Sequence, residues 1–228
     1  ARLIDLSANR DGFIADLSPA GRPGAMLVGS SPEVLVKRQG STVSAFPLAG
    51  SSPRRALAAE DHLAGQDLLH SSKDLHEHAF VVDHLRRALT PLCERLDIPD
   101  APQLISTNEM WHLGTPISGT LKDKDLTALE LALAVHPTPA ICGTPAEAAQ
   151  ALIETAETDR GFYAGAVGWC DSSGDGEYMV AIRCAEVAGD GLSARAWAGG
   201  GIVGDSDAQA ELEETTAKLR TILKALSL

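Results

Sequence analysis

The segment Ser71-Ser72-Lys73-Asp74-Leu75-His76-Glu77-His78 opens the strongest helical pattern in the chain. Apolar side chains follow it at three- and four-residue steps, which predicts a helix over residues 73–92. Asp74 and Glu77 are three residues apart, so they lie on one face of that helix. Two carboxylates placed this way repel each other unless a cation or a lysine lies between them.

A second acidic pair has the same spacing. Glu211 and Glu214 lie in a helix predicted over residues 207–226, and Lys218 follows four residues later. Two helices that each bring two carboxylates to one point would form an oxygen-only site of the kind that Mg²⁺ prefers. The alternative is that both pairs are solvated helix surface, which is common for charged residues of an acidic protein.

The composition limits the kind of protein. With 228 residues and 44% hydrophobic content, the chain can bury a sizeable core as one domain over residues 1–228. Its net charge of −12 argues against nucleic acid or an anionic membrane as a partner. An anionic small molecule would need a local metal ion or arginine. No apolar run approaches about 18 residues and no leader-like start is present, so we expect no membrane span.

The four cysteines are far apart and show no C-x-x-C spacing. They are Cys93, Cys142, Cys170 and Cys184. This pattern indicates reduced core thiols in a cytosolic protein, rather than a disulfide set or a metal cluster.

The alternation of apolar and polar residues predicts an α/β domain dominated by antiparallel hairpins. Strands are expected over residues 1–6, 25–29, 34–37, 42–46, 103–106, 111–119, 164–171, 178–186 and 192–198. Helices are expected over residues 56–70 and 126–135, and from Thr144 as cap and Pro145 as first residue to about Glu157. Residues 47–55 are expected to form a loop, because small residues dominate them.

Several polar residues allow two interpretations each. The glycines at 199, 200 and 201 are either a bend or a backbone nest for an anion. Arg183 lies in an apolar strand pattern, so it either points to solvent or meets a carboxylate. His76 and His78 flank Glu77, but neighbouring helical positions point too far apart to share one tetrahedral zinc ion. His112 and His136 are either satisfied structural histidines or site residues.

Taken together and in chain order, these motifs resemble the chorismate-utilising enzymes, most closely their isochorismate synthase branch. The matching segments are residues 31–33, 47–51, 72–78, 113–116, 136–140, 165–171, 182–184, 198–203 and 211–218, nearly the whole chain. The resemblance implies an α/β (α+β) fold like that of anthranilate synthase component I, with antiparallel sheets wrapped by helices. It also implies Mg²⁺ dependence and chorismate as the substrate.

The resemblance assigns the acidic residues to the metal. It implies that Glu77 and Glu214 ligate Mg²⁺ directly, with Asp74 and Glu211 supporting them, partly through water. The ion would hold the ring carboxylate of chorismate, which the backbone N–H groups of Gly200 and Gly201 would share. Lys218 would balance the acidic cluster.

It also assigns the groups around the substrate. Arg183, with Tyr163 nearby, resembles the clamp on the enolpyruvyl carboxylate, and His112 resembles the histidine beside the ring. Glu33 resembles the general acid that protonates the departing C4 hydroxyl while water attacks C2. Burial near other carboxylates would keep it protonated near neutral pH.

Ala140 and Ile141 lie where the branches of the family differ. Small and apolar side chains there resemble the isochorismate synthases, whereas threonine at position 140 resembles the salicylate synthases and leucine is the family residue at 141. The resemblance places a general-base lysine just before Ala1, so we expect a fold that is incomplete at the N-terminus. The chain would then be part of a longer enzyme or a short relative.

These observations predict a cytosolic, Mg²⁺-dependent isochorismate synthase that serves siderophore or menaquinone-type biosynthesis, as a monomer or weak oligomer. Two alternatives stay open. One is a salicylate synthase, which also eliminates pyruvate. The other is a non-catalytic chorismate-binding remnant without the general base, which would still bind substrate and metal.

Overall fold

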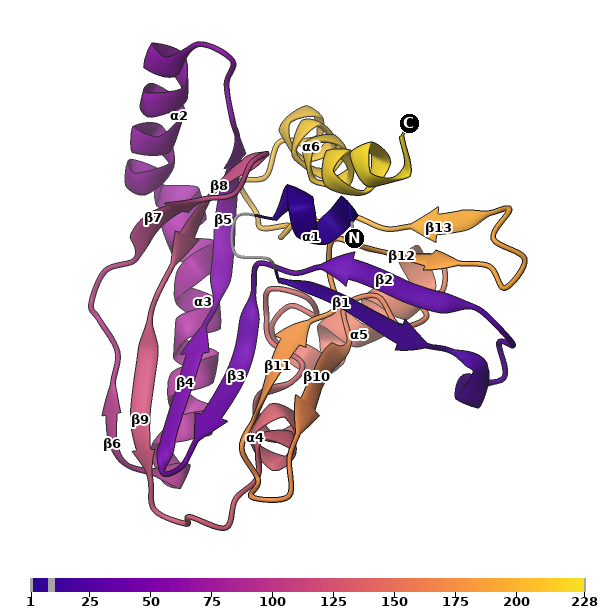
Figure 1. The fold of residues 1–228 in the computed structure, drawn as a ribbon. Helices are drawn as coiled ribbons and strands as arrows, with labels where there is room; N and C mark the ends of the chain where they lie inside the picture. Colours follow the sequence, from indigo (N-terminus) through magenta and orange to yellow (C-terminus); the bar gives the residue numbers. More distant parts are fainter. Residues whose placement is uncertain (1, 8–10, 228) are drawn as a thin grey trace.

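Three antiparallel sheets form the body of the protein in a computed structural model, which describes residues 2–7 and 11–227 (Figure 1). The largest has the order β10 (Ala166–Cys170), β11 (Gly176–Val180), β3 (Val34–Gln39), β4 (Thr42–Phe46), β9 (Ile117–Leu121) and β6 (Cys93–Asp97). A second has the order β1 (Gly12–Asp16), β2 (Met26–Ser30), β12 (Cys184–Val187) and β13 (Ala194–Ala196). The third has the order β5 (Leu48–Pro53), β8 (Met110–Gly114) and β7 (Gln103–Ser106).

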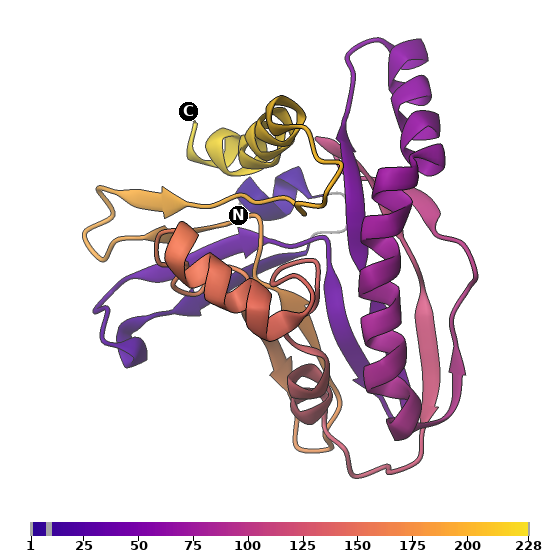
Figure 2. The ribbon, with the colours of Figure 1, turned by 180° about the vertical axis from the view of Figure 1, so that it is seen from behind.

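Helices cover these sheets, as expected. They are α1 (Arg2–Leu6), α2 (Ala58–His70), α3 (Ser72–Leu89), α4 (Ala128–Val135), α5 (Ala146–Ala156) and α6 (Ala208–Leu226), with short 3₁₀ turns at Ser18–Ala20 and Thr90–Leu92. From behind, α3 is seen running along the sheets (Figure 2). None of the described helices is both long and apolar enough to cross a membrane.

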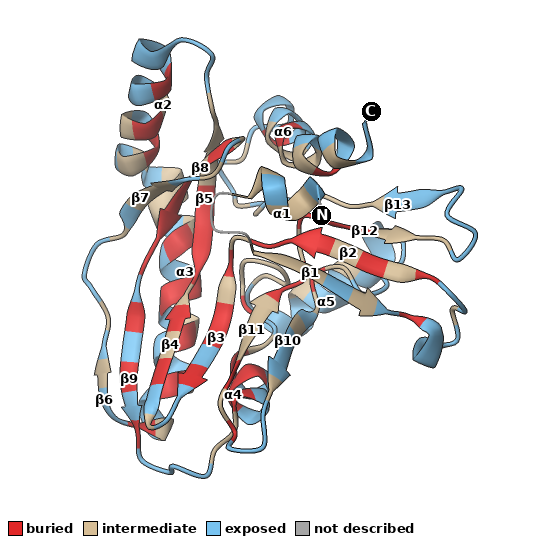
Figure 3. Cartoon of the chain, in the orientation of Figure 1, coloured by how far each residue is buried: buried red, intermediate tan, exposed pale blue. Residues whose placement is uncertain are grey.

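The main core lies between α3, α4 and the six-stranded sheet. Leu85 and Leu89 of α3 and Leu131 of α4 are buried against Val36 and Val43 of the sheet. Figure 3 shows the buried positions on the inner faces of these elements. Burying large aliphatic side chains contributes about 1.5–3 kcal/mol each, so this layer holds α3 firmly in place. Ser71 caps the helix, since its side chain accepts a hydrogen bond from the backbone N–H of Asp74.

At four places the chain passes from one sheet to another through a break of three residues or fewer. They are Ser31–Glu33 between β2 and β3, Pro47 between β4 and β5, Thr115–Pro116 between β8 and β9, and Ala181–Arg183 between β11 and β12. Three of the four contain proline, which cannot donate to the hydrogen-bond ladder of a sheet. The backbone of these breaks forms single hydrogen bonds to another break or to a strand instead of a ladder, such as Thr115 N–H to the Pro47 carbonyl and Val180 N–H to the Glu33 carbonyl.

Several expectations about elements were wrong. Residues 2–6 form a helix rather than a strand, because they pack against α6, where Arg2 donates to the carbonyl of Ala225; Ala1 lies outside the described residues. Residues 48–53 form a strand rather than a loop, because they pair with β8. The strand expected over residues 178–186 is two strands in different sheets.

Smaller differences concern polar elements and the cysteines. Strand β6 was not expected, because its sequence Cys-Glu-Arg-Leu-Asp has little β propensity. Helix α5 begins at Ala146, and no side chain caps it. Cys93 and Cys184 are buried, whereas Cys142 and Cys170 are partly exposed and do not belong to the core.

Candidate active site

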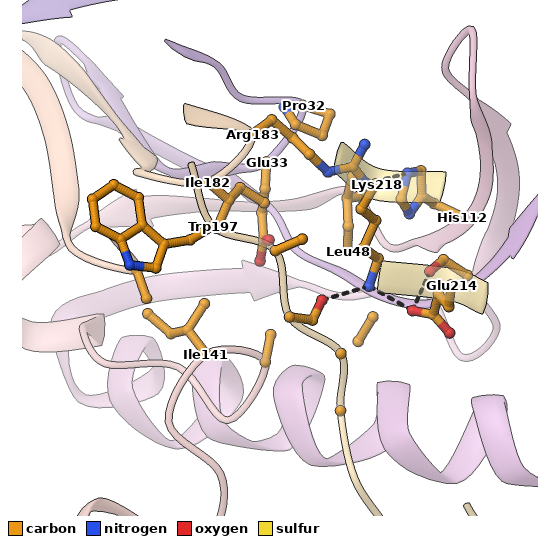
Figure 4. A pocket seen from close by; sticks show the side chains of 18 of the residues that line it. Pro32, Glu33, Leu48, His112, Ile141, Ile182, Arg183, Trp197, Glu214 and Lys218 are labelled. Atoms are coloured by element: carbon orange, nitrogen blue, oxygen red, sulfur yellow. Dashed lines mark hydrogen bonds and ion pairs between the residues drawn. The ribbon is translucent and has the colours of Figure 1, made fainter. Parts of the chain in front are cut away.

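A cavity of about 100 Å³ lies where the sheets meet (Figure 4). Eleven predicted site residues line it: Glu33, Glu77, His112, Ala140, Ile141, Tyr163, Arg183, Gly200, Gly201, Glu214 and Lys218. They come from α3, β8, α6, two of the breaks between sheets and three loops, so only the folded chain brings them together. Asp74 and Glu211 do not line the cavity.

The acidic pairs of α3 and α6 meet at one wall, each close to a lysine. Lys73 of α3 pairs with Glu211 of α6 at 2.6 Å. Lys218 pairs with Glu214 at 2.5 Å, and Ser51 donates a second hydrogen bond of 2.7 Å to the same Glu214 oxygen. The pair of Lys73 and Glu211 thus connects the two helices through their charged side chains.

Glu77 carries no such ion pair in the described part of the chain. Burial, together with the negative charges of Glu214 and Asp74, raises the pKa of Glu77 to about 7. Glu211 is also buried, and its Oε2 atom has no hydrogen-bond partner among the described residues. An acidic wall of this kind is electrostatically unfavourable until a cation or a proton neutralises it.

The glycine run Gly199–Gly201 lies directly over these carboxylates. A β carbon on Gly200 would lie 3.0 Å from Glu211 Oε2 and 3.6 Å from Glu214 Oε1, and one on Gly201 would overlap with Glu77 Oε1. Lys218 donates a hydrogen bond of 2.9 Å to the carbonyl oxygen of Gly199. Glycine is needed here because the backbone approaches charged groups closely.

No group of three or more histidine, cysteine, aspartate or glutamate side chains is arranged as a metal-binding cluster in the residues described. Lys73 and Lys218 each hold one carboxylate of the predicted set. Asp74 accepts a hydrogen bond from Ser71 Oγ at 2.5 Å, at the start of α3. The metal-binding roles of these residues therefore stay a prediction.

Arg183 forms the cationic part of the cavity, with His112 beside it. Arg183 is buried, although the strand pattern left a solvent-facing position open, because the chain breaks there with a φ of +49°. Its Nη2 lies 3.5 Å from His112 Nε2. Burial lowers the pKa of Arg183 to about 10 and, with the charge of Arg183, moves the pKa of His112 well below its usual value. The imidazole is therefore neutral near pH 7.

Glu33 lies at the break between β2 and β3 and is only 4% exposed. Burial raises its pKa to about 7, although the nearby charges of Lys218 and Arg183 act in the opposite direction. A carboxyl group with this pKa is partly protonated at neutral pH and can donate a proton. The expected cause was burial near other carboxylates; burial alone raises the pKa, because the neighbouring charges are those of Lys218 and Arg183, and the role of Glu33 as general acid stays a prediction.

Three of the lining residues outside the predicted set make contacts with predicted ones. Trp197 stacks on Tyr163 with ring centroids 6.1 Å apart, Ser51 contacts Glu214, and Arg160 lies over the Tyr163 ring. Arg160 precedes Tyr163 by three residues, so this proximity was available as a signal. Trp197 offered none, since it lies in an exposed strand pattern far along the chain.

The remaining histidines have structural partners. His78 is buried, with Nδ1 3.1 Å from the Ala49 carbonyl and Nε2 2.7 Å from Thr115 Oγ1. His136 Nε2 lies 3.1 Å from the carbonyl of Ala164. His76 contacts the ring of Phe80. His76 and His78 thus face different surroundings, as the helical geometry predicted.

Comparisons with known proteins show the family and the fold. The family model of the chorismate binding enzymes matches residues 17–227. Isochorismate synthase DhbC of Bacillus subtilis is 50% identical over 217 residues, which are 94% of this chain and 54% of that protein. The crystal structure of DhbC from Bacillus anthracis superposes with a TM-score of 0.87 at 49% identity, covering 90% of this chain and 54% of that one.

Anthranilate synthase component I from Streptococcus pneumoniae shares the fold, with a TM-score of 0.72 at 27% identity over 95% of this chain and 54% of that one. The expected fold class is thus confirmed. The chain spans about half of the length of the relatives it matches. Because the family model covers nearly all of it, the chain belongs to the family of chorismate-binding enzymes.

Proposed function

We propose that this protein is an isochorismate synthase that converts chorismate to isochorismate with Mg²⁺. The observation that carries the proposal is that one cavity combines a buried, partly protonated carboxyl at Glu33, a cationic side at Arg183 and an acidic wall under the glycine run. Its relatives at this level of identity include isochorismate synthases. Since the chain spans about half of their length, the activity is proposed for the whole protein.

Chorismate carries two carboxylates, and the cavity offers a place for each. Arg183 forms no ion pair with a described carboxylate, so its planar guanidinium is free to take the enolpyruvyl carboxylate beside Tyr163. The ring carboxylate would lie at Gly200 and Gly201, where the absence of side chains lets an anion reach the backbone N–H groups. His112, being neutral, would contact the ring without repelling Arg183.

The acidic wall fits a Mg²⁺ ion. Its donors are carboxylate oxygens, one of which is buried without a partner among the described residues, and burial with the charges of Glu214 and Asp74 raises the pKa of Glu77. Glu77 and Glu214 would hold the ion, with Glu211 and Asp74 next to them. When bound, Mg²⁺ supplies the charge that lets the ring carboxylate enter an acidic site. Lys218 holds Glu214 in position and would keep part of the wall neutral.

Glu33 is the proton donor in this proposal. Water attacks C2 of the ring and gives its proton to a general base, which the resemblance takes to be a lysine before Ala1. The double bond shifts, and the C4 hydroxyl leaves as water after receiving the proton of Glu33. The buried position of Glu33 keeps its carboxyl partly protonated at neutral pH, ready for that step. Small and apolar side chains at Ala140 and Ile141 favour an enzyme that stops at isochorismate. A cytosolic location, a monomeric or weakly associated state, and a role in siderophore or menaquinone-type biosynthesis accompany the proposal.

The test is turnover of chorismate with Mg²⁺ by the purified chain and by Glu33→Gln. We expect isochorismate without pyruvate, and a rate about 10²–10⁴-fold lower for the variant, which lacks the acid. Stoichiometric pyruvate would identify a salicylate synthase instead. If both proteins bind chorismate and neither converts it, the non-catalytic alternative holds for this chain.

A further inference from the structure

Arg160 lies in the wall between two cavities. The substrate cavity is adjacent to a larger one of about 850 Å³, and both are lined by Glu77, Ala140, Ile141, Arg160, Gly200 and Gly201. Two of these wall residues are hydrogen-bonded to each other: Arg160 Nη1 donates a hydrogen bond of 2.7 Å to the carbonyl oxygen of Ile141. Arg160 therefore fixes the position of Ile141 in this wall.

The remaining nitrogens of Arg160 are also occupied. Nε donates a hydrogen bond of 2.7 Å to Oε2 of Glu157, and Nη2 donates one of 2.7 Å to Oε1 of the same residue, at the end of α5. The guanidinium also lies 6.0 Å from the centre of the Tyr163 ring. One side chain thus connects α5, the Ile141 loop and Tyr163.

This pattern differs from that of a substrate-binding arginine. Glu157 already neutralises the charge of Arg160, and the hydrogen bond from Arg160 lowers the pKa of the Glu157 carboxyl. Each guanidinium nitrogen donates a hydrogen bond to another group of the protein. Arg183, in contrast, lies in the same cavity without a carboxylate partner among the described residues. The two arginines therefore have different tasks: Arg183 faces the substrate, and Arg160 faces the wall.

We propose that Arg160 is a positioning residue, which holds Ile141 and Tyr163 in place around the substrate and thereby sets the affinity of the cavity for chorismate. The inference rests on the proposed function, because it takes chorismate as the ligand. Without Arg160, the Ile141 carbonyl loses this hydrogen bond, and the wall between the two cavities is weakened at this point. Lysine could reach the Ile141 carbonyl but could not also form the fork with Glu157.

The test is calorimetric titration of chorismate, with Mg²⁺ present, into the full chain and four variants, with thermal melting as a check of folding. Arg160→Ala should bind about tenfold more weakly, the equivalent of one hydrogen bond to a charged group. Arg160→Lys and Glu157→Gln should lie between this variant and the wild type, because each keeps part of the arrangement. Arg86→Ala, which removes an exposed arginine of α3 that lines neither cavity, should bind like the wild type.

The outcomes separate this inference from the proposed function. A folded Arg160→Ala that binds chorismate like the wild type overturns the inference alone, even if its melting temperature is lower. Should Arg160→Ala fail to fold, wild-type affinity in both Arg160→Lys and Glu157→Gln would overturn it. If the wild type itself binds no chorismate, the proposed function fails, and the role of Arg160 fails with it.

Discussion

The carboxylate of Glu77 occupies the space that a side chain at Gly201 would need, because a β carbon there would overlap with Glu77 Oε1. Glu77 comes from α3 and Gly201 from the loop before α6, so this contact fixes how closely the two halves of the site approach each other. It also explains why glycine is needed at a position whose φ is accessible to other residues.

Gly201→Ala should therefore disturb the acidic wall. Either Glu77 moves or the loop is displaced, and overpacking of this kind costs about 1–3 kcal/mol. We expect a melting temperature several degrees lower and a clear loss of chorismate affinity. Gly204→Ala is the matched control, since a β carbon there meets no atom within 4 Å. Equal behaviour of the two variants would show that the contact has no effect.

Arg38 supports the fold away from the site. Its side chain is only 5% exposed and donates to Asp175 at 2.7 Å and to the carbonyls of Ser173 and Lys124 at 2.9 and 2.6 Å. Arg38→Ala would remove these three hydrogen bonds from a buried side chain, so we expect a loss of about 2–4 kcal/mol of unfolding free energy.

Urea denaturation checks this expectation, with Lys37→Ala as the adjacent control. Lys37 is half exposed and lies 3.3 Å from Glu177, so its loss should change the unfolding free energy by less than about 1 kcal/mol. A similar, small effect of both substitutions would contradict the structural role of Arg38.

The sequence was sufficient to predict the elements whose pattern is local. Helices α3 and α6 show regular periodicity, so each acidic pair could be placed on one face of its helix before the fold was known. The break at Ala181–Arg183 could not be predicted, because an uninterrupted apolar run hides it and a non-glycine residue adopts the positive φ. Strand β5 was missed because its small residues form a strand only when β8 lies beside them.

The same difference applies to the site. Residues within a motif could be named, but the contacts that join motifs depend on long-range packing. Ser51 reaches Glu214 across 163 residues and Lys73 reaches Glu211 across 138. The roles of Trp197 and Arg160 became visible only when the strands that carry the cavity were in place.

Glu33 gives a prediction for stability against pH. Its pKa is raised from 4.5 to about 7 in the folded state, so the folded protein holds a proton that the unfolded chain releases above pH 4.5. The stability contributed by this proton is fully present below pH 4.5 and is lost as the pH rises through about 7. Glu33→Gln, which cannot lose a proton, should gain stability over the wild type across this interval, by about 3 kcal/mol at most.

Urea denaturation between pH 4.5 and 8 measures this difference. The pKa of Glu77 is raised as well, so the unfolding free energy of Glu33→Gln still falls with rising pH. The difference between the wild-type curve and the Glu33→Gln curve isolates the contribution of Glu33. Glu94→Gln, on the exposed part of β6, should reproduce the wild-type curve. A constant difference between Glu33→Gln and the wild type at all pH values would contradict a raised pKa for Glu33.

The metal proposal can be tested without any turnover. Mg²⁺ that binds only the folded state raises its stability by about 2.7 kcal/mol at a hundredfold excess over its dissociation constant, which corresponds to several degrees in the melting temperature. We expect this shift for the wild type and its loss in Glu77→Gln and Glu214→Gln, because each removes a ligand charge. Without Mg²⁺, Glu77→Gln should be at least as stable as the wild type, since the amide removes the repulsion from Glu214 and Asp74.

Glu213→Gln is the control: Glu213 is adjacent to Glu214 but exposed, and its partner is Gln209, so the Mg²⁺ shift should persist. An equal shift in all of these proteins would mean that Mg²⁺ binds elsewhere, and α3 and α6 would then carry acidic surface rather than a metal site.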